Sequence, residues 1–200
     1  MKTMEASSNQ YHVLSMREEA EKHQQTKIQK FINTLPKKFR DKYFSDYEAI
    51  SPQQRRIKLF AEKFVSTAAS HVEEGTVLRF FGNPGTGKTL LSLIMCQALV
   101  RRGFTAHYEP SLQFLQVLLE KRNRSMAVYQ SLVDYYSRIE FLVLDGKNEF
   151  FSESEKNILQ CILNKRYQQK NGSTLIIGNH NLSELTNFTL TFNWHSYRQK

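Results

Sequence analysis

Cysteines and long apolar runs are both scarce in this chain. Its 200 residues include only two cysteines, Cys96 and Cys161, and each lies within an apolar helical pattern. Because no cysteine or histidine spacing is typical of a metal site, we expect both cysteines to be reduced residues of the core. No run of about 18 apolar residues occurs, and the first residues contain no apolar stretch of signal-peptide length. These absences predict a cytoplasmic protein with no membrane contact.

Lysine and arginine are absent from residues 171–197, although the chain as a whole is basic. It has 28 lysines and arginines against 19 acidic residues, which gives a formal charge of +9. Such a balance favours polyanionic partners such as nucleic acid, although basic charge also serves solubility.

Short apolar runs alternate with helical patterns after residue 51. We expect strands at 77–81, 104–109, 140–145, 174–177 and 190–192. Helices are expected after Ser51-Pro52 and at 90–102, 112–121, 127–138 and 152–169, the last opened by a capping box. This order predicts an α/β fold with a parallel sheet covered by helices on both faces.

The first fifty residues have a different character. A helix is expected from about residue 13 to 32, but its apolar residues are too few for a helix buried in a core. We interpret residues 1–50 as a helical arm for docking a partner, with a linker after Pro36. Residues 51–200 then form the main domain.

Eight consecutive residues between the first expected strand and the following helix match the pattern G-x-x-x-x-G-K-[ST]. Glycines let backbone amides turn inward to cradle phosphate oxygens, and the helix that follows presents its positive end to the same anion. A lysine at the seventh position pairs with the β- and γ-phosphates, and a hydroxyl at the eighth holds Mg²⁺. The residues are Gly82, Asn83, Pro84, Gly85, Thr86, Gly87, Lys88 and Thr89. They predict a site for ATP and Mg²⁺.

The apolar strand that ends at Asp145 supplies the second part of such a site. A carboxylate at the end of a neighbouring strand can reach the metal, so Lys88 and Asp145 are the residues expected to carry the chemistry. Related ATPases commonly place a glutamate directly after this aspartate, but here the residue is Gly146. Glu149 could replace it only if its loop folds back.

The absence of lysine and arginine from residues 171–197 affects the expected rate of ATP hydrolysis. An arginine that stabilises the transition state contributes about 10³ to 10⁵ in rate where it exists. Because residues 171–197 contain none, and Arg198 is interpreted as solvent-exposed, we expect ATP binding with weak or absent hydrolysis. Asn181, after the fourth strand, can sense the γ-phosphate or simply form a turn.

Lys121, Arg122 and Arg124 form a basic cluster, expected in a loop between two helices. Three tyrosines follow it. Basic and aromatic residues together can bind single-stranded nucleic acid, through contacts to its phosphates and stacking on its bases. Tyr129 and Tyr136, seven residues apart, share one helical face and are alternatively core residues.

The runs FFGNPGTGKT, FLVLD, GNHNLSELT and FNWHSYR resemble the DnaC-type bacterial replicative helicase loaders, AAA+ ATPases related to the transposition helper IstB. The resemblance covers about residues 35–200. It implies an ATP-controlled protein of DNA replication that delivers replicative helicase to single-stranded DNA. It also implies a phosphate sensor at Asn181, or at Asn179, and DNA contact through the paired helices at 112–138.

The chain departs from that family in three places. Gly146 replaces the catalytic glutamate, the N-terminal region is short, and the segment between the fourth and fifth strands is reduced to residues 179–189. The reduction has the form of an internal deletion that removes the arginine finger. The sequence is compatible with a homo-oligomer and with a hetero-oligomer that includes a full-length loader. Alternative functions are a hydrolysis-deficient interaction protein, an IstB-like transposition helper and, less favoured, a P-loop small-molecule kinase.

Overall fold

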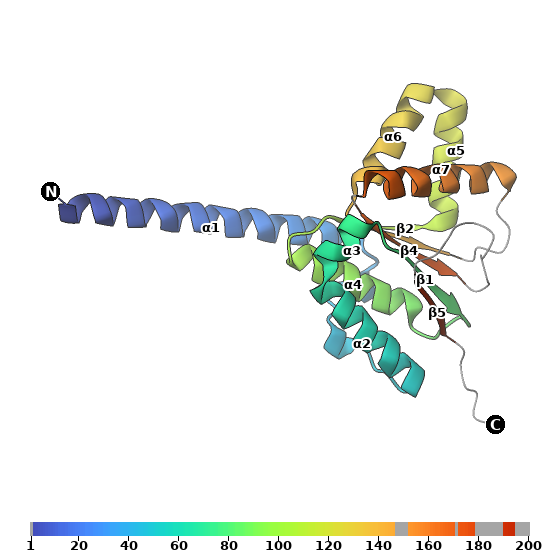
Figure 1. The fold of residues 1–200 in the computed structure, drawn as a ribbon, viewed down its shortest axis with the longest axis horizontal. Coiled ribbons are helices and arrows are strands. Elements are labelled where there is room, and N and C mark those ends of the chain that lie inside the picture. Colours follow the sequence, from blue (N-terminus) through green and yellow to red (C-terminus); the bar gives the residue numbers. More distant parts are fainter. Residues whose placement is uncertain (1, 147–151, 171, 179–189, 195–200) are drawn as a thin grey trace.

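The computed structural model describes residues 2–146, 152–170, 172–178 and 190–194 (Figure 1). For residues 2–15, 17 and 190–194 it describes the backbone alone.

Five parallel strands form one sheet in the order β2-β3-β4-β1-β5. The strands are β1 (Val77–Gly82), β2 (Ala106–Pro110), β3 (Phe141–Asp145), β4 (Ser173–Gly178) and β5 (Leu190–Trp194). All five strands predicted from the sequence are confirmed, as is their parallel pairing. The order places β1 between β4 and β5, where Leu78 lies opposite both Leu175 and Leu190.

Helices cover both faces of the sheet, as predicted (Figure 1). One layer contains α2 (Pro52–Ser66), α3 (Ala68–Glu74) and α4 (Lys88–Arg101), and the other contains α5 (Ser111–Arg124), α6 (Met126–Arg138) and α7 (Glu153–Gln169).

Strand residues divide between the two layers by simple alternation. Phe141 and Val143 of β3 pack in the same cluster as α2 and α4, whereas Leu142 and Leu144 pack with α5, α6 and α7. Successive side chains of a strand point to opposite faces, so a strand that is apolar throughout needs a cover on each side.

The predicted helix starts at Ser51 and Ser152 are confirmed. The Ser51 hydroxyl accepts a hydrogen bond from the backbone amide of Gln54, and the side-chain oxygen of Gln54 accepts one from the backbone amide of Ser51. Ser152 and Glu155 make the same reciprocal arrangement at the start of α7. Three short elements were not predicted: α3 and two single turns of 3₁₀ helix, η1 (Lys37–Phe39) and η2 (Phe44–Asp46).

The first helix, α1 (Lys2–Thr34), is longer than predicted and projects away from the domain (Figure 1). Among its described side chains only Ile32 is buried, which agrees with the prediction that it is no core helix. Its attachment lies near its C-terminal end, where Gln24 donates a hydrogen bond to the Val100 carbonyl of α4 at 2.8 Å.

Two predictions about local structure are wrong. Lys121, Arg122 and Arg124 do not lie in a loop, because α5 continues to Arg124 and α6 starts two residues later, with Ser125 as its N-cap. Cys161 is exposed rather than part of the core, although Cys96 is buried and both thiols are free as expected. Among the helices that the structure describes, none is long and apolar enough to cross a membrane.

Candidate nucleotide-binding site

The glycine-rich loop leaves the carboxyl end of β1 and leads directly into α4. Gly85 and Gly87 have φ angles of 78° and 92°, in the region that side chains disfavour. A Cβ atom on Gly87 would also lie 2.9 Å from the ring of Tyr47, so this position requires glycine for both conformation and space. The Thr86 carbonyl accepts a hydrogen bond from Gln54 of α2, which ties the loop to the neighbouring helix.

Lys88 begins α4 and folds back over the loop. Its ammonium donates to the carbonyls of Gly82 and Asn83, each at 2.8 Å, and the side chain is only 6% exposed. Burial lowers the pKa of Lys88, while the nearby carboxylate of Asp145 acts to raise it. A cation held at the loop by neutral carbonyls is placed to pair with phosphate oxygens, which match its charge better.

The side chains of Thr89 and Asp145 are in contact beside the phosphate loop. The Thr89 hydroxyl donates to the Asp145 carboxylate at 2.7 Å, and the Tyr108 hydroxyl of β2 donates to the same oxygen at 3.0 Å. Burial, together with the charge of Asp145, raises the pKa of Tyr108, so this tyrosine remains a neutral donor. The sheet therefore brings together the two predicted metal-side residues, and it adds a tyrosine that the sequence did not indicate.

These oxygen atoms suit a small divalent cation. Mg²⁺ is commonly held by one or two protein oxygens together with phosphate oxygens and water. Thr89 and Asp145 provide a hydroxyl and a carboxylate side by side next to the phosphate loop, so the donor set fits Mg²⁺ with a bound nucleotide.

An open pocket of about 410 Å³ lies against the loop. The loop residues from Pro84 to Leu90 form one wall, and Asp145, Gly146 and Ile177 form another. The remaining wall is Phe39, at the end of η1 in the linker after α1. Sequence reasoning missed Phe39, because nothing local marks a linker phenylalanine as part of a site built 45 residues later.

The residue after Asp145 brings no carboxylate into this pocket. Gly146 lines the pocket wall, and its amide donates to the Ile177 carbonyl of β4. Glu149, Asn179 and Asn181 lie outside the described residues, so their predicted roles stay predictions.

The basic cluster of α5 is a surface feature. Arg122 and Arg124 are exposed, and Arg124 makes an ion pair with Glu120 at 3.2 Å. Tyr129 is buried and Tyr136 packs edge-on against Phe114, which favours the core interpretation of these two tyrosines. Tyr135 alone of the three is exposed, at 52%.

Comparison with known proteins identifies relatives of this fold and site. The family model of the IstB-like ATP binding proteins matches residues 2–191. The replicative helicase loader DnaC of Escherichia coli strain K12 is 27% identical over 156 residues. That match covers 68% of this chain and 63% of the relative, so this chain spans less than two thirds of the relative's length.

Solved structures agree with this fold. A crystal structure of the DnaC helicase loader has a TM-score of 0.65 at 24% identity, over 74% of this chain and 82% of that one. The replication initiator DnaA, bound to AMPPCP and single-stranded DNA, has a TM-score of 0.64 at 16% identity, over 80% and 50% of the two chains. The fold is thus the AAA+ type of P-loop domain, and the resemblance drawn from the sequence is confirmed.

Proposed function

This chain belongs to the IstB-like ATP-binding protein family, and we propose that it binds ATP with Mg²⁺ as a switch in DNA replication. The observation that carries the proposal is the convergence of Lys88, Thr89 and Asp145 at one pocket. Lys88 neutralises the β- and γ-phosphates, and the two oxygen side chains hold the metal. Mg²⁺ held by Thr89 and Asp145 would neutralise part of the phosphate charge.

Nucleotide titration tests the site. Labelled ATP is expected to bind with a dissociation constant in the micromolar range, about −8 kcal/mol. Lys88→Ala should weaken binding by about 100-fold or more, because the loop then lacks its cation. Lys63→Ala removes an exposed lysine at the end of α2 and serves as the matched control. Equal affinity of Lys88→Ala and the unaltered chain for ATP would refute the assignment of the loop.

We propose further that hydrolysis is slow. Gly146 offers no group to orient water, and residues 171–197 supply no cation for the transition state. Turnover by the purified chain should fall well below the roughly 1 s⁻¹ of slow ordinary enzymes, with and without single-stranded DNA and replicative helicase. Vigorous hydrolysis by the chain alone would contradict the proposal.

The proposed partner of the arm is the replicative helicase. α1 projects from the domain with most of its described side chains exposed, as a docking helix requires. The full chain should retain replicative helicase in a pull-down, and a chain that starts at residue 35 should not, while both bind ATP. Retention of a transposase instead of the helicase would favour the alternative function of an IstB-like transposition helper. The family to which the chain belongs is consistent with that alternative.

Single-stranded DNA is the second proposed partner, through Lys121, Arg122 and Arg124. Replacing all three by glutamine should weaken binding and reduce the salt dependence by about 0.7 per lost phosphate contact. Replacing the exposed cations Lys22, Lys30 and Lys63 removes the same net charge and is the control. Equal losses in the two triple variants would mean that only net charge matters for DNA binding.

The oligomeric state is a separate question. Light scattering with and without ATP tests whether the chain assembles with itself or with a full-length loader.

A further inference from the structure

Two neighbouring residues of the linker serve two different parts of the molecule. Phe39 forms a wall of the nucleotide pocket, whereas Arg40 binds the end of α1. The Arg40 guanidinium donates to the carbonyls of Asn33, in the last turn of α1, and of Leu35, just after it, each at 2.8 Å, and so caps this end of the helix. A shift of this linker would therefore reach both the pocket and the arm.

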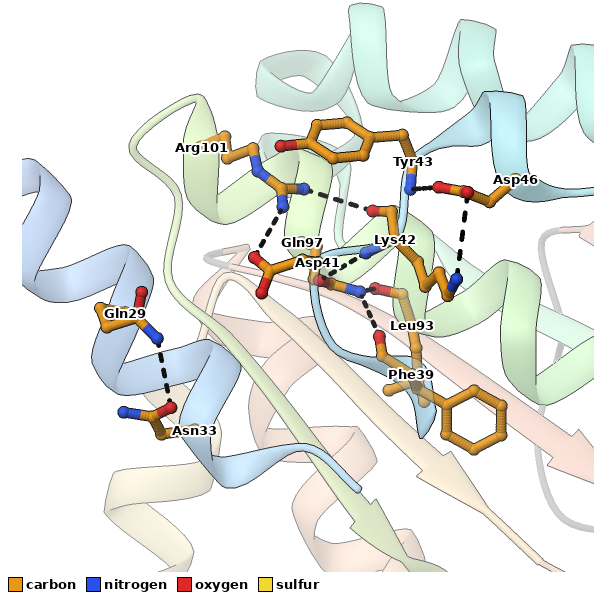
Figure 2. Close-up of polar contacts among 10 residues, drawn as sticks. All are labelled: Gln29, Asn33, Phe39, Asp41, Lys42, Tyr43, Asp46, Leu93, Gln97 and Arg101. Carbon is orange, nitrogen blue, oxygen red and sulfur yellow. Dashed lines mark hydrogen bonds and ion pairs between the residues drawn. The ribbon is translucent and has the colours of Figure 1, made fainter. Parts of the chain in front are cut away.

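Gln97 of α4 fixes the backbone of the same linker (Figure 2). Its side-chain amide donates to the carbonyls of Phe39 at 2.9 Å and Leu93 at 3.2 Å, and its oxygen accepts the Lys42 amide at 3.2 Å. Gln97 is 1% exposed, so no water competes for these bonds. A buried amide whose donor and acceptor are both used holds its partners in one arrangement.

Arg101 continues this attachment one helical turn later (Figure 2). It donates to the Lys42 carbonyl at 3.4 Å, pairs with Asp41 at 3.8 Å and lies 4.2 Å from the centre of the Tyr43 ring. The backbone at Asp41 has a φ of 50°, a conformation that requires support from its surroundings when the residue is not glycine. Gln97 and Arg101 together provide that support.

One rigid helix connects these contacts to the phosphate loop. Lys88 opens α4, and Gln97 follows nine residues later, roughly 13 Å along the axis at 1.5 Å per residue. Near its other end, α4 receives the hydrogen bond from Gln24 of the arm at the Val100 carbonyl. The phosphate contacts, the wall of the pocket and the base of the arm thus share α4 as their common support.

We propose that Gln97 is a positioning residue that holds Phe39 against the base of a bound nucleotide and thereby couples nucleotide occupancy to the arm. The inference rests on the proposed binding of ATP. An aromatic ring stacks on the flat face of a purine, so ATP binds more tightly when the linker is in place. By linkage, ATP then stabilises the linker and the arm that Arg40 caps by the same factor. Inorganic tripolyphosphate, which has no base, gains nothing from Phe39.

The test compares ATP with inorganic tripolyphosphate on the full-length chain. Gln97→Met keeps the volume of the side chain but removes its hydrogen bonds to the linker. We expect it to weaken ATP binding by about 10-fold, within the 5- to 150-fold range of ordinary coupling, and to change tripolyphosphate binding by less than about twofold. Gln29→Met is the matched control, since the side chain of Gln29 donates to Asn33 on the exposed face of α1 and, within the part of the chain that the structure describes, does not bond to the linker (Figure 2).

Hydrogen exchange supplies the second readout. ATP should slow amide exchange in residues 22–35 of the unaltered chain and of Gln29→Met by about 5-fold or more, and should leave it unchanged in Gln97→Met. Phe39→Ala, which alters no buried core residue, should reproduce the selective loss of ATP affinity even if Gln97→Met folds poorly.

Three results would overturn the proposal. The first is an equal loss of affinity for ATP and tripolyphosphate in both Gln97→Met and Phe39→Ala, which would indicate general damage. The second is arm protection by ATP that persists in Gln97→Met, and the third is an unaltered chain that binds ATP without protecting the arm. Binding of neither ligand by the unaltered chain is a different failure, because it would refute the ATP site itself and the coupling with it.

Discussion

The phosphate loop and the arm are held in opposite ways. The loop is fixed from several elements: Gln54 of α2 binds Thr86, the Tyr47 ring covers Gly87, and Asp145 of β3 binds Thr89. The arm touches the domain mainly through the last part of α1, where Ile32 is its single buried side chain among those described.

The phosphate loop and the arm therefore keep their conformations for different physical reasons. The loop has backbone angles that are unfavourable for most residues, and it persists because its neighbours determine it from several sides. A helix satisfies its own backbone, and the 33 residues of α1 exceed the roughly 12 to 15 that an isolated helix needs. Its length thus favours a helix, but the stability of its last turns and the direction of the arm depend on few contacts. We expect changes in the loop to act on binding and on the stability of the whole domain, and changes in the arm to leave the sheet and its core unaltered.

After the loss of Lys88, the largest effect on ATP binding is expected at the metal side of the loop. Asp145→Asn removes the charge that pairs with Mg²⁺ and should weaken Mg²⁺-dependent ATP binding by about 10- to 100-fold, or 1.4 kcal/mol per factor of ten. Tyr108→Phe keeps the carboxylate of Asp145 and should weaken Mg²⁺-dependent ATP binding by about threefold or less. Titrations with Mg²⁺ and with EDTA measure both variants. If EDTA weakens ATP binding to Asp145→Asn as much as to the unaltered chain, Asp145 is not the metal ligand.

Gly85 and Gly87 of the loop, both at positive φ, should differ in a thermal melt. Gly87→Ala combines an unfavourable φ with contact against Tyr47 and should cost about 2 to 3 kcal/mol, a fall in Tm of roughly 5–10 °C. Gly85→Ala meets no atom within 4 Å, so only the backbone cost of about 1 kcal/mol applies, or roughly 2–4 °C. Equal falls in Tm would mean that Tyr47 does not restrict the loop.

Ile32→Ala should release the arm without unfolding the domain. Ile32 is 3% exposed but belongs to neither of the two core clusters of the sheet, so its packing free energy of about 2 to 4 kcal/mol supports the arm rather than the core. Amide exchange in residues 22–34 should accelerate while exchange in β1 and β3 stays unchanged. Met16→Ala, at an exposed position of the same helix, is the control. Faster exchange in the strands would show that arm and domain form one cooperative unit.

The smallest effect is expected where the linker joins the two regions. Asp41→Gly relieves the positive φ but removes the partner of Arg101, an ion pair that is largely exposed on the Asp41 side. The two changes oppose each other and should leave the free energy of unfolding within about 1 kcal/mol, as measured by urea denaturation. A larger loss would mean that the ion pair contributes more than exposed pairs usually do.

Several parts of the fold were predictable because their signals are local. The helix start at Ser51 is marked by an N-cap serine followed by proline, and the one at Ser152 by a capping box whose residues are three apart. The five strands are short apolar runs that differ clearly from their surroundings. The cluster of Lys121, Arg122 and Arg124 was misplaced for the opposite reason. A basic run is equally compatible with a loop and with the last turn of a helix, where cations complement the helix dipole. Likewise, the sequence alone could not tell that Cys161 lies on the outer side of α7.

The sequence by itself determined the phosphate loop, its lysine and threonine, and the strand that ends in Asp145, because eight contiguous residues define the loop's backbone chemistry. Only the tertiary structure decided that Tyr108 shares Asp145 with Thr89, that Phe39 closes the pocket, and that Gln97 holds the linker. The hydrogen bonds among these contacts join residues 37 to 58 positions apart. No local pattern encodes such a contact, since it arises only when the sheet places the ends of β2 and β3 together and α4 packs against the linker.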